Sequence, residues 1–385
     1  MRTPSPLLLS VLLVACTGDD ASLPDAAPAL DAPVVLDSGH TVDAGVDATP
    51  AAPCTCLALG VDYATGVGTA STVSLPSLTV TQGVLSMAAV SGDPVVRLLD
   101  GKLFIVNRFG ADNVTIVDPV TFTVTAQVST GGGSNPQDVA VLGDELFVVA
   151  LSLPYLLVYD LTDLTAPPTT IGLPVAMPLD ADGTPEAASI AIVGGRAYVT
   201  MQHLESFVPA GPGSVTVIDL ATHTVERTFS LANANPTSLL RGRAAELLVA
   251  TVPDYSPTAG CVERVRLGGM AGSDGCLVDA AELGGYVSAI APGDDGHVYV
   301  AASASFSEGQ IVKVSDTGEI VTARLSGAGQ NPTDLAYCAS QHMLVSNDGN
   351  GGGLRVFDLD DGVELTAAPL NIGLPPTFAS GIVCY

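Results

Sequence analysis

The feature that most constrains this chain is a unit of roughly 45 residues that recurs from about residue 90 onward. Each unit opens with a short apolar segment, passes a turn containing Gly or Asp, and returns with a second apolar segment, as in NPQDVAVLGDELFVV from Asn135 to Val149. Such a pattern is typical of a β-hairpin. Matching segments begin at Asp93, Asn135, Pro185, Asn235, Gly285 and Asn331.

The second half of each unit repeats as well. In NVTIVDPVTFTVTAQV, apolar and polar residues alternate strictly from Phe122 to Val128, which predicts a strand with one buried face. An Asp recurs at the turn before this strand, where its carboxylate can accept a hydrogen bond from the amide two residues ahead. Because the position repeats, we interpret these residues as turn residues and not as catalytic ones. They are Asp118, Asp160, Asp219, Asp316 and Asp358.

Four short strands per unit are the signature of a β-propeller blade. Six whole blades start near residues 95, 138, 189, 238, 288 and 334. The last segment, Ala379 to Cys384, matches the first strand of a further blade, and residues 56–87 supply three strands without an inner partner. We therefore predict an all-β, seven-bladed propeller of four-stranded antiparallel blades over 54–385. Its seventh blade joins both ends of the chain and so closes the ring, and neither end segment is left unpaired.

The segment from Leu103 to Val141 resembles the YVTN-type propeller repeat, in which VTN, a loop, VSVID, a Thr-rich strand, NP and VAV follow one another. The resemblance is partial over about 95–375 and weakest between Cys261 and Leu283, where the turn Asp is missing. It implies a seven-bladed fold on extracytoplasmic proteins. It implies no single activity, since related propellers include lactonases and electron-transfer enzymes. The absence of Trp argues against a WD-type repeat.

The N-terminus has the features of a sorting signal. The apolar run from Leu7 to Ala15 is shorter than the ~20 residues of a membrane span, which indicates a signal peptide over 1–15. Leu13-Val14-Ala15-Cys16 resembles the bacterial lipobox, and that resemblance implies lipidation of Cys16 with a diacylglyceryl group and a further acyl chain such as palmitate. Two or more acyl chains anchor a protein stably. Thr17, in place of the Asp that signals inner-membrane retention, favours the outer membrane. The alternative to lipidation is an ordinary signal peptide in which Cys16 has no role.

Residues 16–53 are predicted to be a disordered acidic linker rich in Asp, Ala and Pro, because they carry seven Asp and no Lys or Arg after Cys16. The whole chain has a net charge of −27, so nucleic acid is excluded as a partner on electrostatic grounds. The expected partners are the membrane, through the lipid anchor, and an envelope protein or a small polar ligand.

Six cysteines remain after Cys16, an even number that fits disulfides in an oxidising compartment. Cys261 and Cys276 flank one hairpin and are expected to pair. Cys56 should pair with Cys384 on the neighbouring strand of the seventh blade, which leaves Cys54 for Cys338. The alternative joins Cys338 to Cys384 and Cys54 to Cys56, but residues two apart on a strand lie ~6–7 Å from each other.

Loops that join the second to the third strand, and loops between blades, surround one mouth of a propeller's channel. Binding residues usually lie on such loops. The candidates here are mostly carboxylates, with one His and one Arg, and they would hold a polar ligand or a divalent cation such as Ca²⁺. They are Asn107, Arg108, Asp138, Glu186, His203, Glu205, Asp254, Asp334, Asn347 and Asp348.

No haem-attachment, phosphate-loop, nucleophile-elbow, EF-hand or H-E-x-x-H motif is complete in the sequence. We therefore predict no cofactor and favour a non-catalytic binding or scaffolding propeller on the bacterial cell envelope over an enzyme. The alternative is a lactonase-type hydrolase with a divalent metal at the channel mouth. Convergence of the candidate carboxylates to metal-ligand distances would distinguish the two.

Overall fold

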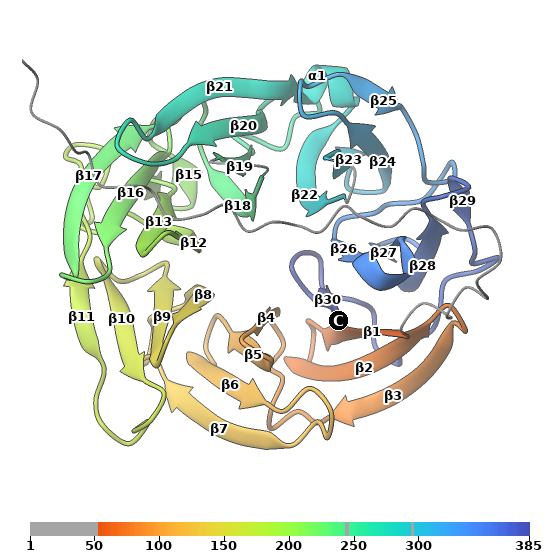
Figure 1. Cartoon of the computed structure of the whole chain (residues 1–385), viewed down its shortest axis with the longest axis horizontal. Coiled ribbons are helices and arrows are strands. Elements are labelled where there is room, and N and C mark those ends of the chain that lie inside the picture. The colour runs from red at the N-terminus through yellow and green to blue at the C-terminus, as the bar shows by residue number, and fades with distance from the viewer. Residues whose placement is uncertain (1–52, 243–245, 294–295) are drawn as a thin grey trace, which may run out of the picture. The chain divides into compact units, whose positions relative to one another are not determined.

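The computed structural model describes residues 53–242, 246–293 and 296–385. These residues form seven four-stranded antiparallel sheets that fan around a common axis (Figure 1), which confirms the predicted seven-bladed propeller. The predicted signal peptide, Cys16 and all of the predicted linker except its last residue lie outside the described residues. Within the described part of the chain, no helix is long and apolar enough to cross a membrane.

Each blade runs from an inner strand at the axis to an outer strand. Blade one is β4 (Pro94–Leu99), β5 (Lys102–Asn107), β6 (Asn113–Val117) and β7 (Val124–Ser129). Blade two is β8 (Pro136–Leu142), β9 (Glu145–Ala150), β10 (Tyr155–Asp160) and β11 (Thr169–Gly172). Blade three is β12 (Ala187–Val193), β13 (Arg196–Met201), β16 (Ser214–Asp219) and β17 (Thr224–Ser230), with the hairpin β14 (Leu204–Glu205) and β15 (Val208–Pro209) inserted.

Blade four is β18 (Pro236–Arg241), β19 (Glu246–Thr251), β20 (Cys261–Arg266) and β21 (Gly272–Asp279), followed by the one-turn helix α1 (Ala280–Leu283). Blade five is β22 (Tyr286–Pro292), β23 (Val298–Ser305), β24 (Glu308–Val314) and β25 (Ile320–Thr322). Blade six is β26 (Leu335–Cys338), β27 (Met343–Asp348), β28 (Gly353–Asp358) and β29 (Val363–Glu364), with a 3₁₀ turn, η1 (Ala339–Gln341).

The seventh blade closes the ring as predicted. The C-terminal strand β30 (Ile382–Cys384) is its inner strand, and β1 (Cys54–Asp62), β2 (Val67–Leu75) and β3 (Thr79–Leu85) follow outward. In the register of β30 against β1, Ile382 lies opposite Ala58 and Cys384 opposite Cys56. The antiparallel pairing continues in two backbone hydrogen bonds of 2.8 Å, from Thr55 N to Tyr385 O and from Leu59 N to Gly381 O.

Packing between neighbouring blades forms the core. The second strand of each blade is almost entirely buried, as in LFVV of β9, because both of its faces are covered by adjacent blades. Phe147 and Val149 of blade two, for example, belong to the same cluster as Ile190 and Val199 of blade three. Each such buried side chain stabilises the fold by about 1.5–3 kcal/mol. The outer strands are mostly exposed, so Val128 alone of the β7 side chains is buried.

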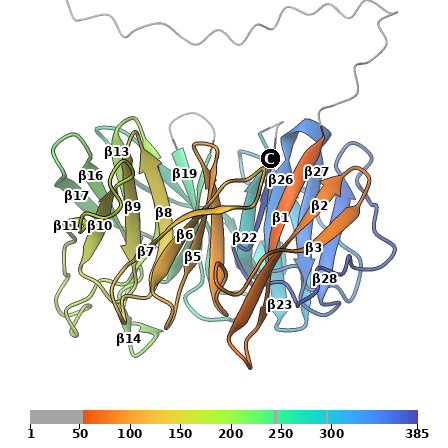
Figure 2. The same ribbon diagram turned by 90° about the horizontal axis from the view of Figure 1, so that it is seen from below.

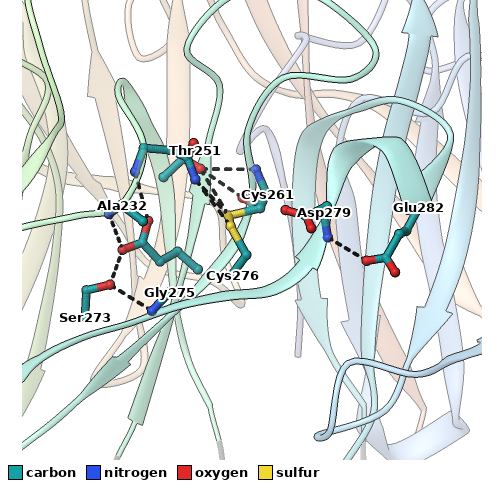
Figure 3. Close-up of a disulfide and its surroundings, with 10 residues drawn as sticks. Ala232, Thr251, Cys261, Ser273, Gly275, Cys276, Asp279 and Glu282 are labelled. Atoms are coloured by element: carbon teal, nitrogen blue, oxygen red, sulfur yellow. Dashed lines mark hydrogen bonds between the residues drawn. A yellow bond between two sulfur atoms is a disulfide. The ribbon is translucent and has the colours of Figure 1, made fainter.

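Three disulfides have the expected pairing. Cys56 of β1 joins Cys384 of β30 within the seventh blade, and Cys54 joins Cys338 between blades seven and six. Cys261 joins Cys276 within blade four (Figure 3). Cys54 and Cys56 lie on one strand, β1, and each is bonded to a partner on another strand, so the alternative pairing is wrong.

The recurring turn Asp has its predicted role in four of the five positions. The carboxylate of Asp118, for example, accepts hydrogen bonds from Val120 N (2.9 Å) and Thr121 N (2.8 Å). Asp160, Asp219 and Asp358 accept equivalent bonds from the amide two residues ahead.

Asp316 is the exception, and its prediction was wrong by one residue. In blade five the hydroxyl of Ser315 accepts the turn bonds, from Thr317 N (3.3 Å) and Glu319 N (3.0 Å). A Ser at this position makes the same type of turn as an Asp. Asp316 instead contributes its backbone carbonyl, which accepts a hydrogen bond from Arg264.

Candidate functional site

We call the mouth the end of the channel where the loops from second to third strands and the loops between blades come together. It is the lower end of the ring in Figure 2, where β14 lies. All ten predicted binding residues lie on these loops or on the strand ends beside them. Their side chains, however, serve different purposes.

Asp138 links blades two and three. It lies near the start of β8, is 3% exposed, and its Oδ2 accepts a hydrogen bond from Ile190 N of β12 (3.1 Å). Its Oδ1 accepts from Val139 N (2.9 Å) and lies 2.8 Å from Nε of Arg97 on the inner strand of blade one. One carboxylate therefore joins three adjacent blades, which makes it a structural residue and not a free ligand.

Asp334 has the same position in blade six. It is 3% exposed and accepts hydrogen bonds from Leu335 N (3.0 Å) and from Gly381 N at the start of the seventh blade (2.7 Å). Burial raises the pKa of Asp334 to about 6, and the bonds from backbone amides and the charge of Arg97 only partly offset that effect. This carboxylate too ties one blade to the next.

Asn107 and Asn347 hold loops with their side-chain amides. Oδ1 of Asn107 accepts from Ser91 N (2.8 Å), and its Nδ2 donates to Ala89 O (3.1 Å). Oδ1 of Asn347 accepts from Thr333 N (2.7 Å), and both Asn side chains are at most 2% exposed. Neither amide is left free for a ligand.

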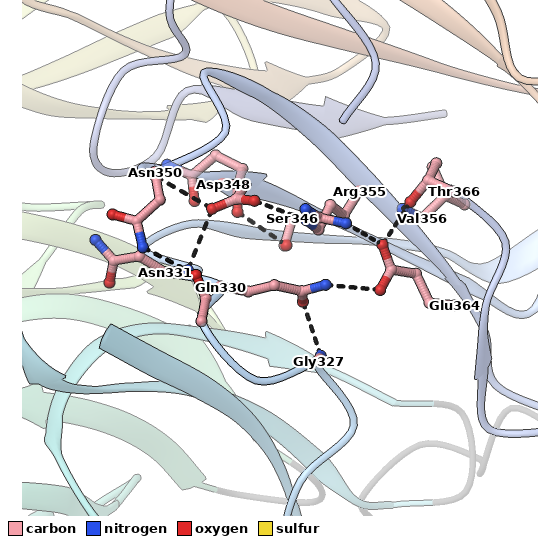
Figure 4. Close-up of polar contacts among 12 residues, drawn as sticks. Gly327, Gln330, Asn331, Ser346, Asp348, Asn350, Arg355, Val356, Glu364 and Thr366 are labelled. Carbon is pink, nitrogen blue, oxygen red and sulfur yellow. Dashed lines mark hydrogen bonds and ion pairs between the residues drawn. The ribbon is translucent and has the colours of Figure 1, made fainter. Parts of the chain in front are cut away.

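Asp348 belongs to a charged network within blade six (Figure 4). Its Oδ2 accepts from Nε of Arg355 (2.7 Å), whose Nη1 donates to Glu364 (2.5 Å), while its Oδ1 accepts from Asn331 N (3.2 Å) and Asn350 N (3.1 Å). Burial alone would raise the pKa of Asp348, but Arg355 and the backbone amides of Asn331 and Gly351 outweigh burial and lower it. The network fixes the loop after β27.

Arg108, Glu205 and Asp254 are the candidates nearest to solvent. Nη2 of Arg108 donates to Asp93 (2.6 Å), and the carboxylate of Asp254 accepts from Ser256 N (2.8 Å). Glu205 is exposed on the β14 hairpin. These three residues come from blades one, three and four and do not form one cluster.

Blade three contains the arrangement closest to a catalytic one. Nδ1 of His203 lies 2.5 Å from Oδ1 of Asp180, and its Nε2 lies 2.7 Å from Oγ of Ser214, the order of acid, base and hydroxyl in a hydrolytic triad. The three residues are 0%, 2% and 5% exposed, so Ser214 is closed to a substrate. The triad therefore serves to hold the long loops of this blade together. The carboxylate of Glu186, whose pKa burial raises, supports the same loops by accepting from Leu204 N (2.6 Å).

Convergence of the candidate carboxylates, which the hydrolase alternative requires, is not seen among the described residues. Among the described residues, the groups of three His, Cys, Asp or Glu side chains close enough to share an ion are Cys54–Cys56–Cys384 and Cys261–Cys276–Asp279. In each group the sulfurs are already bonded in disulfides.

Exposed aromatic side chains are the feature that sequence reasoning missed. In the described part of the chain, every Phe and Tyr that is exposed lies on a loop at the mouth, with exposures of 49–79%. Four blades also contribute to one largely apolar pocket of about 340 Å³ at the mouth. The exposed aromatic residues are Tyr63, Phe109, Phe207, Tyr255, Phe306 and Phe378.

Comparison with known proteins gives the fold alone. No protein-family profile matches the chain, and no curated protein does. A structure of hydrazine synthase from Kuenenia stuttgartiensis is similar at 17% identity, with a TM-score of 0.51 over 70% of this chain and 76% of that one. The Swd1 propeller domain from Myceliophteria thermophila is 11% identical, with a TM-score of 0.60 over 78% and 96%. Apo AztD from Citrobacter koseri is 11% identical, with a TM-score of 0.52 over 86% and 98%.

Proposed function

We propose that this protein is a non-catalytic binding module of the bacterial cell envelope, anchored in the outer membrane by lipid on Cys16, with the mouth of the propeller as its binding face. The observation that carries the binding role is the gathering of exposed aromatic side chains at that mouth. Aromatic residues are enriched where proteins bind partners, because they offer a large apolar area at little cost in conformational entropy.

The polar residues support a binding role over catalysis. Asp138, Asp334 and Asn347 are engaged in bonds within the fold, and the His203 triad is closed to solvent. The propeller face offers rigid loops on a disulfide-closed ring, which suits recognition of a partner without a large change of shape.

The anchor is tested by metabolic labelling of the full chain with palmitate. We expect label on the wild type and none on Cys16→Ser, together with loss of that variant from the membrane fraction. Label that persists on Cys16→Ser, or a wild type that is never labelled, would show that the anchor is wrong.

The binding face is tested by hydrogen exchange on the full-length lipoprotein in detergent, with and without a solubilised envelope extract. We expect slower exchange in the mouth loops 252–260 and 305–308 and no change in the hairpin turns at the opposite end. Protection confined to that opposite end, or no protection anywhere, would contradict the proposal.

A further inference from the structure

One pocket at the mouth has aromatic walls and no charge of its own. It has a volume of about 340 Å³, within the usual range for ligand sites, and is lined by residues of blades four, five, six and seven. None of its lining residues is Asp, Glu, Lys, Arg or His, and its polar atoms belong to hydroxyl and amide groups. Its rings are Tyr255, Tyr286, Phe306 and Phe378.

Each ring of the pocket contacts another aromatic ring. The ring of Tyr255 lies 5.4 Å from that of Tyr286 in an edge-to-face arrangement and 5.9 Å from that of Phe306. Phe378 stacks on Tyr63 at 5.5 Å. Tyr286 is 7% exposed at the floor, while Tyr255 and Phe306 are 60% and 79% exposed at the rim, so the pocket is open to solvent and already formed.

The charge of the propeller selects the sign of a ligand. Without Arg2 and the seven Asp of residues 1–52, the chain keeps 12 basic and 33 acidic residues. Two exposed carboxylates, Asp254 and Glu308, lie one and two residues from Tyr255 and Phe306 in the sequence. Such a field attracts cations and repels anions.

The neutral walls select the kind of cation. A metal ion would need anionic oxygen ligands, and the pocket lining offers none. Aromatic faces instead attract large organic cations whose charge is spread over methyl groups and which lose little hydration on burial. Charge complementarity and the chemistry of the walls thus agree on one class of ligand.

We propose that this pocket binds a quaternary ammonium group. The inference deepens the binding role proposed for the mouth and depends on it. The group has two sources, a free small molecule such as choline and the headgroup of a choline lipid, and both present the same trimethylammonium to the rings.

The test is calorimetric titration of the full-length lipoprotein in detergent with choline and with its neutral isostere 3,3-dimethyl-1-butanol. We expect choline to bind at least tenfold more tightly than the isostere, and the choline affinity to fall with added salt. Glycerophosphocholine serves as the soluble form of the lipid headgroup. Whichever of the two choline compounds binds more tightly identifies the source, and either result supports the proposal.

The variant Tyr255→Leu locates the site, because it removes a largely exposed ring but keeps an apolar side chain. It should weaken choline binding about tenfold. Phe109→Leu, which replaces a ring outside the pocket that is 75% exposed, should leave choline binding unchanged. Asp254→Asn should weaken binding less and should reduce the salt dependence.

The possible failures are distinguishable. Equal binding of choline and the isostere would show that the pocket is an apolar site without preference for a cation. Equal loss of choline binding in Tyr255→Leu and Phe109→Leu would show that the binding site is not this pocket. If choline does not bind but the envelope extract still protects the mouth loops, the ligand class is wrong and the binding face stands. If neither occurs, both proposals fail.

Discussion

Blades two and six begin with nearly the same four residues, NPQD at Asn135 and NPTD at Asn331. The Asp of each motif is 3% exposed, accepts a hydrogen bond from the next amide in the chain, and accepts another from the following blade. Asp138 and Asp334 therefore make the same blade-to-blade link. Their surroundings differ in two respects.

Asp138 has an ion pair with Arg97 at 2.8 Å. Asp334 accepts hydrogen bonds from backbone amides instead, and the more distant charge of Arg97 only lowers its pKa. The link made by Asp334 is instead reinforced by the Cys54–Cys338 disulfide, which joins blades six and seven covalently. One repeated motif is thus stabilised by an ion pair at one site and by a covalent bond at another. The following experiments remove these supports one at a time.

The largest loss is expected from Cys54→Ser/Cys338→Ser. With Cys56–Cys384 intact, this bond closes a path of roughly 50 residues, which corresponds to about 4 kcal/mol in the chain-entropy description. Cys261→Ser/Cys276→Ser, which opens a separation of 15 residues, should cost about 3 kcal/mol. Denaturant unfolding measures the free energy lost in each double variant. A larger loss from removing Cys261–Cys276 than from removing Cys54–Cys338 would contradict the proposed role of the bond between blades six and seven.

Asp138→Ala should cost about 3 kcal/mol, because Arg97 and Ile190 N both lose their partner in a largely buried place. Asp334→Ala is the matched control and should cost less while the disulfides are intact. In the Cys54→Ser/Cys338→Ser background, Asp138→Ala and Asp334→Ala should lower the free energy of unfolding by similar amounts, as measured by a double-mutant cycle. An Asp138→Ala loss smaller than that of Asp334→Ala in the wild-type background would refute the comparison.

The sequence predicted the ring well, because a repeated strand pattern and an unpaired segment at each end leave few ways to close a sheet. The disulfides followed from that topology: Cys56 and Cys384 become neighbours as soon as β30 pairs with β1. Ser315, by contrast, shows the limit of a pattern that tracks only Asp, since a hydroxyl one residue earlier makes the same turn.

The site was harder to predict, because the partners of a polar side chain are decided by the fold. Arg97 stands in an apolar strand, and nothing in its neighbourhood along the chain indicates Asp138. Asp180 and Ser214 lie 23 and 11 residues from His203, Asp180 in a loop and Ser214 at the start of β16. Exposure of Tyr255 or Phe306 likewise depends on packing and leaves no pattern in the sequence.

The charge of Asp334 gives a smaller, pH-dependent effect. Since folding raises its pKa from 3.8 to about 6, the folded state binds a proton more tightly, and stability from this group grows as the pH falls through 6. Between pH 7 and pH 4.5 the wild type should gain roughly 2 kcal/mol relative to Asp334→Asn, which cannot titrate. Unfolding curves of both proteins at each pH measure the difference. A difference in unfolding free energy between the two proteins that stays constant with pH would contradict the raised pKa of Asp334.

The smallest effects are expected at the outer turns of the same two blades, where Asp160 and Asp358 accept from Thr162 N (2.8 Å) and Asp360 N (2.9 Å). Both turns are exposed, so Asp160→Ala and Asp358→Ala should lower the unfolding midpoint slightly and about equally. The hydroxyl and amide of Thr162 lower the pKa of Asp160, so its contribution is present above the ordinary value of 3.8 and is lost as the pH falls below it. The difference in unfolding midpoint between the wild type and Asp160→Ala should therefore narrow in acid, whereas the difference between the wild type and Asp334→Asn should widen. Midpoints measured from pH 7 to pH 3 test this opposition of sign, and a gap for Asp160→Ala that widens in acid would contradict it.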